Sequence, residues 1–165
     1  MFSLLRFQEM GGSVGRILQG NYRDCYIDLN VSSEPASKLF VEDLAVEGKR
    51  VIVRVDFNVP LKDGVVESDK RLRESLPTIK YLRDKGAKVI LMSHLGRPDG
   101  KPVPDMSLRP VTKALSDLLG APVTFAEDCV GEKARAAVAA LSPKGVLLLE
   151  NLRFHPEEEK TDPGF

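Results

Sequence analysis

The chain has 165 residues, which is enough for one ordinary domain with a hydrophobic core. Its 24 Lys and Arg residues balance 24 Asp and Glu residues. This balance argues against a general nucleic-acid or membrane-surface binder, because such proteins depend on excess positive charge. Because the overall charge is balanced, any anion site must be a local concentration of basic side chains. No apolar run approaches the roughly 20 residues of a membrane span.

The two cysteines, Cys25 and Cys129, lack the spacing of metal ligands. Sparse thiols of this kind are typical of a reducing compartment, so we expect unpaired, partly buried thiols, a cytoplasmic location and no metal site. Residues 1–37 contain scattered Gly, Ser and Pro and resemble neither a secretory leader nor an acid-poor transit peptide. We expect a poorly structured extension there, with one short strand at residues 25–31.

The regular pattern begins at Lys38. A strand rich in Val and Ile is predicted over residues 49–55, followed by a turn at the Asp63-Gly64 pair. Asp69 is the predicted N-cap of a helix over residues 70–85 that ends at Gly86. Pro77 lies inside this helix, which predicts either a kink or a later start.

Strands and helices continue to alternate along the rest of the chain. This alternation predicts an α/β fold with right-handed βαβ units and a mostly parallel sheet. Residues 156–165 resemble the approach to a further helix, so we expect the sheet to be incomplete on that side, with an edge that could self-associate. The remaining elements are predicted strands at 88–92, 123–125 and 145–149, helices at 107–120 and 132–141, and a Pro/Gly-rich loop at 97–106.

Three predicted strands end in polar or basic residues. Asp56 and Asn58 follow the first strand, His94 and Arg97 follow the second, and Arg153 follows the last. In an open α/β sheet, ligands bind outside the carboxyl ends of the strands, so these side chains are predicted to converge. Arg can grip a carboxylate or phosphate with two parallel hydrogen bonds. The pattern favours a small-anion site.

Each of these residues also has a simpler interpretation. Asp56 and Asn58 could cap a loop, His94 could satisfy a loop carbonyl, and Arg153 could be a solvated surface residue. Arg71 opposes the dipole of its helix, unless it helps the helix N-terminus to hold an anion. Glu157, Glu158 and Glu159 are predicted to form a solvated helix start. No Gly-rich phosphate-binding motif is present, so the residues alone indicate an α/β domain with an Arg-rich small-anion site.

The same segments resemble phosphoglycerate kinase, in that family's order and at its spacing. The resemblance covers residues 38–165, which we expect to form part of an N-terminal, phosphoglycerate-binding domain. Residues 1–37 have no counterpart in it. The segments that carry the resemblance are 54–60 (RVDFNVP), Arg71, 76–82 (LPTIKYL), 93–98 (SHLGRP) and 149–155 (LENLRFH).

The resemblance implies a monomeric glycolytic enzyme with a Rossmann-like, three-layer domain. It transfers a phosphoryl group between 1,3-bisphosphoglycerate and ADP, giving 3-phosphoglycerate and ATP, and its C-terminal domain binds the Mg-ATP or Mg-ADP. On this resemblance, Asp56 and Asn58 hold the glyceryl end of the substrate, and Arg71 neutralises the transferring phosphoryl group. The carboxylate and the 3-phosphate would bind to His94, Arg97 and Arg153.

The family's further basic segment, Gly-Thr-Ala-His-Arg, and its nucleotide domain do not occur in this chain. We therefore expect a truncated phosphoglycerate kinase that is inactive by itself. Two alternatives stay open: a non-catalytic module that binds small anions, and a truncated product that does not fold stably. Protection by phosphoglycerate would favour the module, and aggregation through an exposed edge would favour the unstable product.

Overall fold

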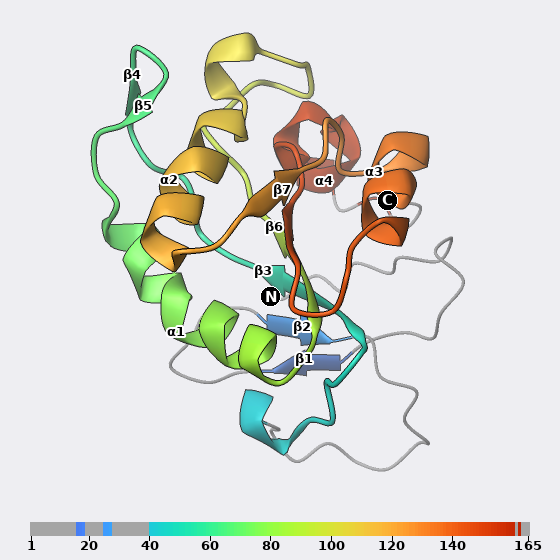
Figure 1. Cartoon of the computed structure of the whole chain (residues 1–165). Coiled ribbons are helices and arrows are strands. Elements are labelled where there is room, and N and C mark those ends of the chain that lie inside the picture. Colours follow the sequence, from blue (N-terminus) through green and yellow to red (C-terminus); the bar gives the residue numbers. More distant parts are fainter. Residues whose placement is uncertain (1–15, 19–24, 28–39, 161, 163–165) are drawn as a thin grey trace.

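The structure is a computed structural model that describes residues 16–18, 25–27, 40–160 and 162. In the described residues, the main sheet has six strands in the order β1-β2-β3-β6-β8-β7 (Figure 1). Strands β3, β6, β8 and β7 are parallel, whereas β1 and β2 are antiparallel to their neighbours. The strands are β1 (Arg16–Leu18), β2 (Cys25–Ile27), β3 (Arg50–Arg54), β6 (Lys88–Met92), β7 (Val123–Phe125) and β8 (Val146–Leu148).

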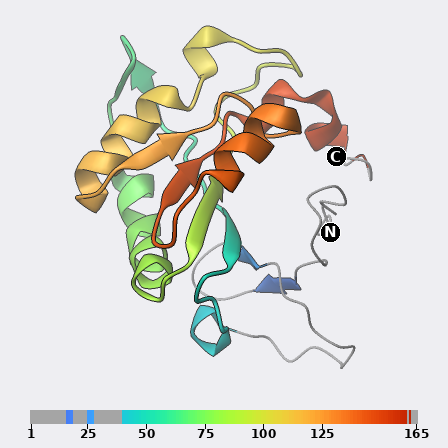
Figure 2. The same cartoon turned by 45° about the vertical axis from the view of Figure 1, so that its right-hand side comes forward.

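Helices cover both faces of the parallel strands, so the expected three-layer α/β architecture is confirmed. Figure 2 shows α1 and α2 on one side of the strands and α3 on the other. Among the described residues, none of the helices has both the length and the apolar character needed to cross a membrane. The helices are α1 (Lys70–Asp84), α2 (Arg109–Leu119), α3 (Gly131–Ala139) and the short α4 (Pro156–Lys160), with 3-10 turns η1 (Val41–Asp43), η2 (Pro104–Met106) and η3 (Leu152–Phe154).

The central strands are apolar because both of their faces are buried. On β6, Val89 and Leu91 join the core under α1 and α2, whereas Ile90 and Met92 join the core under α3. Successive side chains of a strand point to opposite faces. The continuous apolar run of β6 therefore serves two hydrophobic cores.

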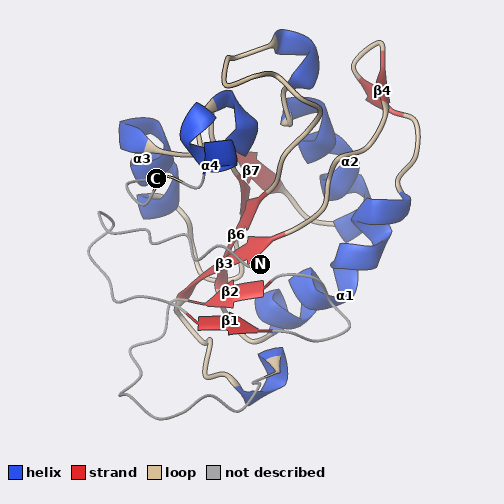
Figure 3. Cartoon of the chain, turned by 180° about the vertical axis from the view of Figure 1, so that it is seen from behind, coloured by secondary structure: helices blue, strands red, loops and turns tan. Residues whose placement is uncertain are grey.

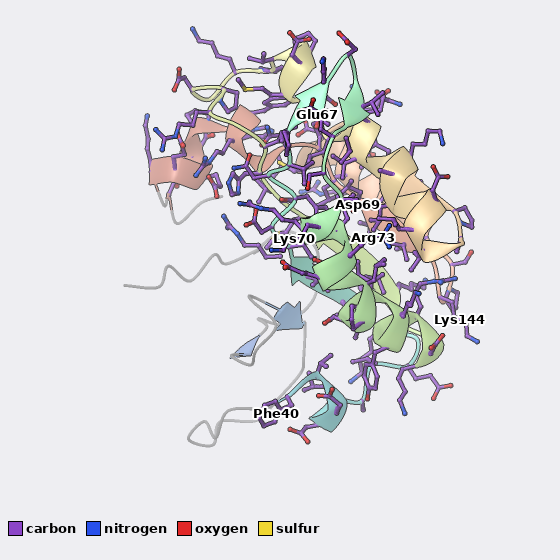
Figure 4. All side chains as sticks on the ribbon, turned by 90° about the vertical axis from the view of Figure 1, so that its left-hand side faces the viewer. Phe40, Glu67, Asp69, Lys70, Arg73 and Lys144 are labelled. Atoms are coloured by element: carbon purple, nitrogen blue, oxygen red, sulfur yellow. The ribbon has the colours of Figure 1, made fainter. Side chains whose placement is uncertain are left out.

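The predicted helix after Asp69 begins where expected, but its first turn differs in detail. Asp69 occupies the N-cap position without making a side-chain cap hydrogen bond. Its carboxylate instead accepts a hydrogen bond from Arg73 Nε at 2.9 Å, and Figure 4 shows Asp69, Lys70 and Arg73 together at this end of α1. The helix runs through Pro77 from Lys70. A start after Pro77 is therefore wrong.

The turn at Asp63 and Gly64 is confirmed. These two residues join the short antiparallel strands β4 (Leu61–Lys62) and β5 (Val65–Val66). Both have positive φ, 50° for Asp63 and 73° for Gly64, as a tight hairpin turn requires.

Part of the N-terminal extension belongs to the sheet. The predicted strand at residues 25–31 is present as β2 over Cys25–Ile27, and residues 28–31 lie outside the described residues. A second strand, β1, was not predicted, because the segment RIL is too short to show a period. Strand β2 pairs with β3 along Val51–Val53, so it lies at the edge of the parallel strands (Figure 3).

Candidate anion-binding site

The segment after β3 contacts the first turn of α1 through a short ion pair. Arg71 Nη1 donates to Asp56 Oδ1 at 2.6 Å, and both side chains are nearly half exposed. The same carboxylate oxygen accepts the backbone N–H of Asn58 at 3.2 Å. Phe57 and Val59 are buried while Asp56 and Asn58 are not, so the alternation expected after the strand is present. Asp56 thereby orients Arg71, whose side chain remains 45% exposed.

The loop after β6 is tied to the loop after β3 by two hydrogen bonds. The backbone N–H of Gly96 donates to Asn58 Oδ1 at 3.0 Å, and that of Phe57 donates to the buried Ser93 Oγ at 2.9 Å. Gly96 has φ of 65°, and a Cβ there would lie 2.9 Å from Met106 Sδ. The positive φ favours glycine at this position, and a side chain there would also displace the flexible end of Met106.

The segment after β8 completes the arrangement. Arg153 Nη1 donates to the backbone oxygen of Gly96 at 3.0 Å. Asn151 is fully buried, and its Nδ2 donates to the backbone oxygens of Leu95 at 2.7 Å and Met106 at 2.9 Å. Asn151 therefore joins the loops that carry His94 and Arg153. The sequence motif contains Asn151, but its positioning role depends on contacts that spacing does not reveal.

His94 is half-buried at the centre of these charges. Burial lowers its pKa below the usual 6.5, and the positive charges of Arg153 and Arg54 lower it further, against the opposing effects of Asp56 and Glu158. The imidazole is therefore neutral at pH 7 and can donate one hydrogen bond to an anion. A bound phosphate would favour its protonated form.

Arg97 follows Gly96 and is exposed. It makes no hydrogen bond or ion pair with any residue that the structure describes. Its guanidinium keeps all its donors for solvent or a ligand. Arg71 is thus linked to Asp56, and Asp56 to Asn58, while Asn58 and Arg153 both bond to Gly96. The charges of Asp56 and Arg153 affect His94. Arg97 lies on the same loop as His94 and Gly96.

Sequence reasoning missed Arg54 and was wrong about the acidic turn after His155. Glu158, with a side chain 7% exposed, accepts a hydrogen bond from Arg54 Nη2 at 2.7 Å. Glu159 lies 3.3 Å from Arg153 Nε. This start of α4 is therefore not simply solvated, because two of its carboxylates neutralise part of the positive charge beside the site. Arg54 and Glu158 are 104 residues apart, so no local pattern could predict their pairing.

Comparisons with known proteins assign the family. The family model described as phosphoglycerate kinase matches residues 41–165. The chain belongs to the phosphoglycerate kinase family. It is 60% identical over 129 residues to the phosphoglycerate kinase of Moorella thermoacetica, which covers 78% of this chain and 33% of the relative. It is 58% identical over 127 residues to that of Dictyoglomus turgidum, covering 77% of this chain and 32% of the relative.

Solved structures give the same result for the fold. The crystal structure of phosphoglycerate kinase from Pyrococcus horikoshii matches with a TM-score of 0.66 at 41% identity, covering 72% of this chain and 29% of that one. The structure of phosphoglycerate kinase from Coxiella burnetii matches with a TM-score of 0.60 at 37% identity, covering 70% of this chain and 28% of that one. The chain thus spans about a third of the length of its phosphoglycerate kinase relatives and corresponds to their N-terminal portion.

Proposed function

We propose that this chain is the phosphoglycerate-binding portion of a phosphoglycerate kinase. The reaction is the reversible transfer of a phosphoryl group between 1,3-bisphosphoglycerate and ADP, giving 3-phosphoglycerate and ATP in glycolysis. A cytoplasmic location and a monomeric state belong to the same proposal, and both rest on family resemblance. The observation that carries the proposal is that the segments after β3, β6 and β8 are joined by hydrogen bonds. Asn58 and Arg153 both bond to Gly96, and Arg71 bonds to Asp56, so basic side chains come to one edge of the sheet.

The proposed roles follow from what each side chain can donate or accept. Asn58 and Asp56 bind the glyceryl hydroxyl end of the substrate, because amide and carboxylate groups pair well with hydroxyls. His94, Arg97 and Arg153 bind the carboxylate and the 3-phosphate, whose charges match the donors that converge there.

Arg71 is the proposed catalytic residue. It stabilises the charge that develops on the transferring phosphoryl group, which is the main task of a protein in phosphoryl transfer. Its ion pair with Asp56 at 2.6 Å holds the guanidinium in place before substrate binds. An arginine that is already oriented needs little reorganisation during the reaction.

We assign the Mg-ATP and Mg-ADP to the part of the relatives that lies beyond the match. Mg²⁺ requires oxygen ligands, whereas the candidate site is mainly cationic and rich in N–H donors. Its one acidic member, Asp56, already accepts hydrogen bonds from Arg71 and from Asn58. The isolated 165-residue polypeptide is therefore expected to bind phosphoglycerate without catalysing transfer.

A thermal melt of the purified chain tests this proposal. Millimolar 3-phosphoglycerate should raise the midpoint, because a ligand that binds only the folded state stabilises it by mass action. Arg97→Ala should abolish the shift without changing the melt of the free protein, since Arg97 makes no hydrogen bond or ion pair with the described residues. Lys80→Ala, which removes an exposed positive charge from α1, is the matched control and should keep the shift.

Three results would overturn parts of the proposal. An equal loss of the shift in Lys80→Ala would mean that the ligand responds only to overall charge. A cooperative melt without any shift would contradict the binding site. Kinase activity of the pure polypeptide above background would contradict its expected inactivity.

A further inference from the structure

A second cluster of chemically active side chains lies outside the anion-binding site. Asp128 and Cys129 lie between β7 and α3, and His155 follows η3. Their carboxylate oxygen, Sγ and imidazole nitrogen all lie within 4.8 Å of one another. We propose that Asp128, Cys129 and His155 form a binding site for a divalent transition-metal ion of the Zn²⁺ type.

The choice of ion follows from the ligand atoms. Thiolate and imidazole ligands suit Zn²⁺ and Co²⁺, whereas Mg²⁺ and Ca²⁺ prefer oxygen alone. Three protein ligands leave the fourth tetrahedral position for water or another small ligand. This composition differs from the Mg-nucleotide chemistry of phosphoglycerate kinase, so the proposed ion is not the metal of the phosphoryl transfer.

The present distances require only a small adjustment. With metal–ligand bonds of about 2.0–2.3 Å, two ligands of one tetrahedral ion lie about 3.3–3.8 Å apart. His155 Nε2 is 2.8 Å from Asp128 Oδ1, and no pair in the cluster is separated by more than 4.8 Å. For an ion to bind, the distance between His155 Nε2 and Asp128 Oδ1 has to lengthen slightly, and the longest of the three distances between ligand atoms has to shorten by about 1 Å. Side-chain rotations can provide changes of this size.

Backbone hydrogen bonds already orient the carboxylate. Asp128 Oδ1 accepts the N–H of Cys129 at 2.7 Å and that of Val130 at 3.4 Å. Such bonds to a metal ligand fix its orientation and raise affinity. The side chains of His155 and Asp128 are 29% and 37% exposed, so an ion can enter from solvent, while Cys129, at 1% exposure, supplies a ligand that is screened from water.

Cobalt binding to the purified, reduced chain tests the proposal. Co²⁺ bound by a thiolate has a charge-transfer band in the near ultraviolet, and tetrahedral Co²⁺ absorbs in the visible range. Both bands should appear on titration, and added Zn²⁺ should remove them, whereas added Mg²⁺ should not. Cys129→Ser should abolish the charge-transfer band, and the matched control Cys25→Ser, which removes the other cysteine of the chain, should keep it.

His155→Gln and Asp128→Asn supply the second arm of the test. Each should weaken Co²⁺ affinity by at least about tenfold, with circular dichroism confirming that the variant is folded. The proposal would be overturned by the absence of both bands at millimolar Co²⁺, by a band that survives Cys129→Ser, or by one that is lost in Cys25→Ser. If Cys129→Ser does not fold, unchanged Co²⁺ affinity in folded His155→Gln would overturn it equally.

Discussion

Two asparagines of the candidate site illustrate how burial decides the task of a residue. Asn151 is fully buried. Its Nδ2 donates to the backbone oxygens of Leu95 and Met106, and its Oδ1 accepts the backbone N–H groups of Leu95 and Arg153. Asn58 is exposed and accepts one hydrogen bond, from Gly96. An unsatisfied buried polar group costs far more than one that water can reach. We therefore expect Asn151 to contribute mainly to stability and Asn58 mainly to ligand binding.

Alanine substitutions separate these two tasks. Asn151→Ala should lower the free energy of unfolding by about 3 kcal/mol, because it leaves several buried backbone groups without partners. Asn58→Ala should cost less than about 1 kcal/mol but weaken 3-phosphoglycerate binding. Urea denaturation measures the first effect and the ligand-dependent melt the second. Equal destabilisation by the two variants would contradict these assignments.

His94 gives the pH dependence a definite sign. Its pKa is lowered from 6.5, first by burial and then by Arg153, so the unfolded chain binds this proton more readily than the folded chain does. The stability that this neutral imidazole contributes is present above pH 6.5 and is lost as the pH falls through the lowered pKa. Acidification should therefore destabilise the protein through His94.

The comparison of wild type with His94→Gln isolates this effect. Between about pH 7.5 and about pH 5, the wild type should lose more unfolding free energy than His94→Gln, because Gln does not titrate. Urea denaturation across this range measures the difference, and an NMR titration of the two histidines gives the pKa directly. A wild type that resists acid better than His94→Gln would contradict the sign.

The residues of the candidate site were largely predictable because each lies within five residues after the end of a strand or begins a helix. Asp56, Asn58 and His94 follow β-branched or apolar runs, and the carboxyl ends of parallel strands meet at one edge. Pairing across the chain was not predictable. The contact of Arg54 with Glu158 depends on where α4 docks, which no local pattern specifies.

At the scale of elements, the position of α4 depends on the loop after β6. Gly100 has φ of 71°, and a Cβ there would lie 2.7 Å from Pro156 Cβ, at the start of α4. The two segments therefore pack with no space for a side chain. This contact supports the acidic turn that lies beside Arg54 and Arg153.

Two glycine substitutions measure the importance of that contact. Gly120→Ala should cost about 1 kcal/mol, because Gly120 has φ of 67° but nothing within 4 Å of its added Cβ. Gly100→Ala should cost about 1–3 kcal/mol more, because overpacking adds to the same backbone strain. Chemical denaturation provides both values. Equal costs would mean that α4 moves away without penalty.

The four parallel strands and helices α1, α2 and α3 were predicted within one or two residues, whereas β1 was missed. Strands β6 and β7 have the predicted bounds, because each is a short apolar or β-branched run with clear limits. Helix α1 continues through Pro77, which shows that tertiary packing outweighs the helix-breaking tendency of one proline. Leu72, Ile79 and Leu82 of this helix are fully buried, and their burial supplies the compensating free energy.

At the scale of the whole molecule, residues outside the family match take part in the sheet. The match begins at residue 41, yet β2 pairs with β3 through Cys25, Tyr26 and Ile27. A strand whose edge is unpaired presents N–H and C=O groups to other chains. Strand β2 therefore protects the outer edge of β3.

Deletion of residues 1–37 tests this role. The shortened chain should self-associate and unfold at a lower temperature, because the deletion removes β1 and β2 and leaves the edge of β3 unpaired. Sedimentation velocity and thermal melts measure the two effects. A shortened chain that is monomeric and as stable as the original would show that this strand pairing contributes nothing.

Isothermal titration calorimetry with three related ligands tests the central claim most directly. The account predicts that the purified chain binds 3-phosphoglycerate more tightly than glycerol 3-phosphate, which lacks the carboxylate, or glycerate, which lacks the phosphate. Arg153→Ala should reduce this preference, because it removes one of the guanidinium groups proposed to bind the carboxylate and the 3-phosphate. Equal binding of all three ligands, or of inorganic phosphate and 3-phosphoglycerate alike, would contradict a site built for phosphoglycerate.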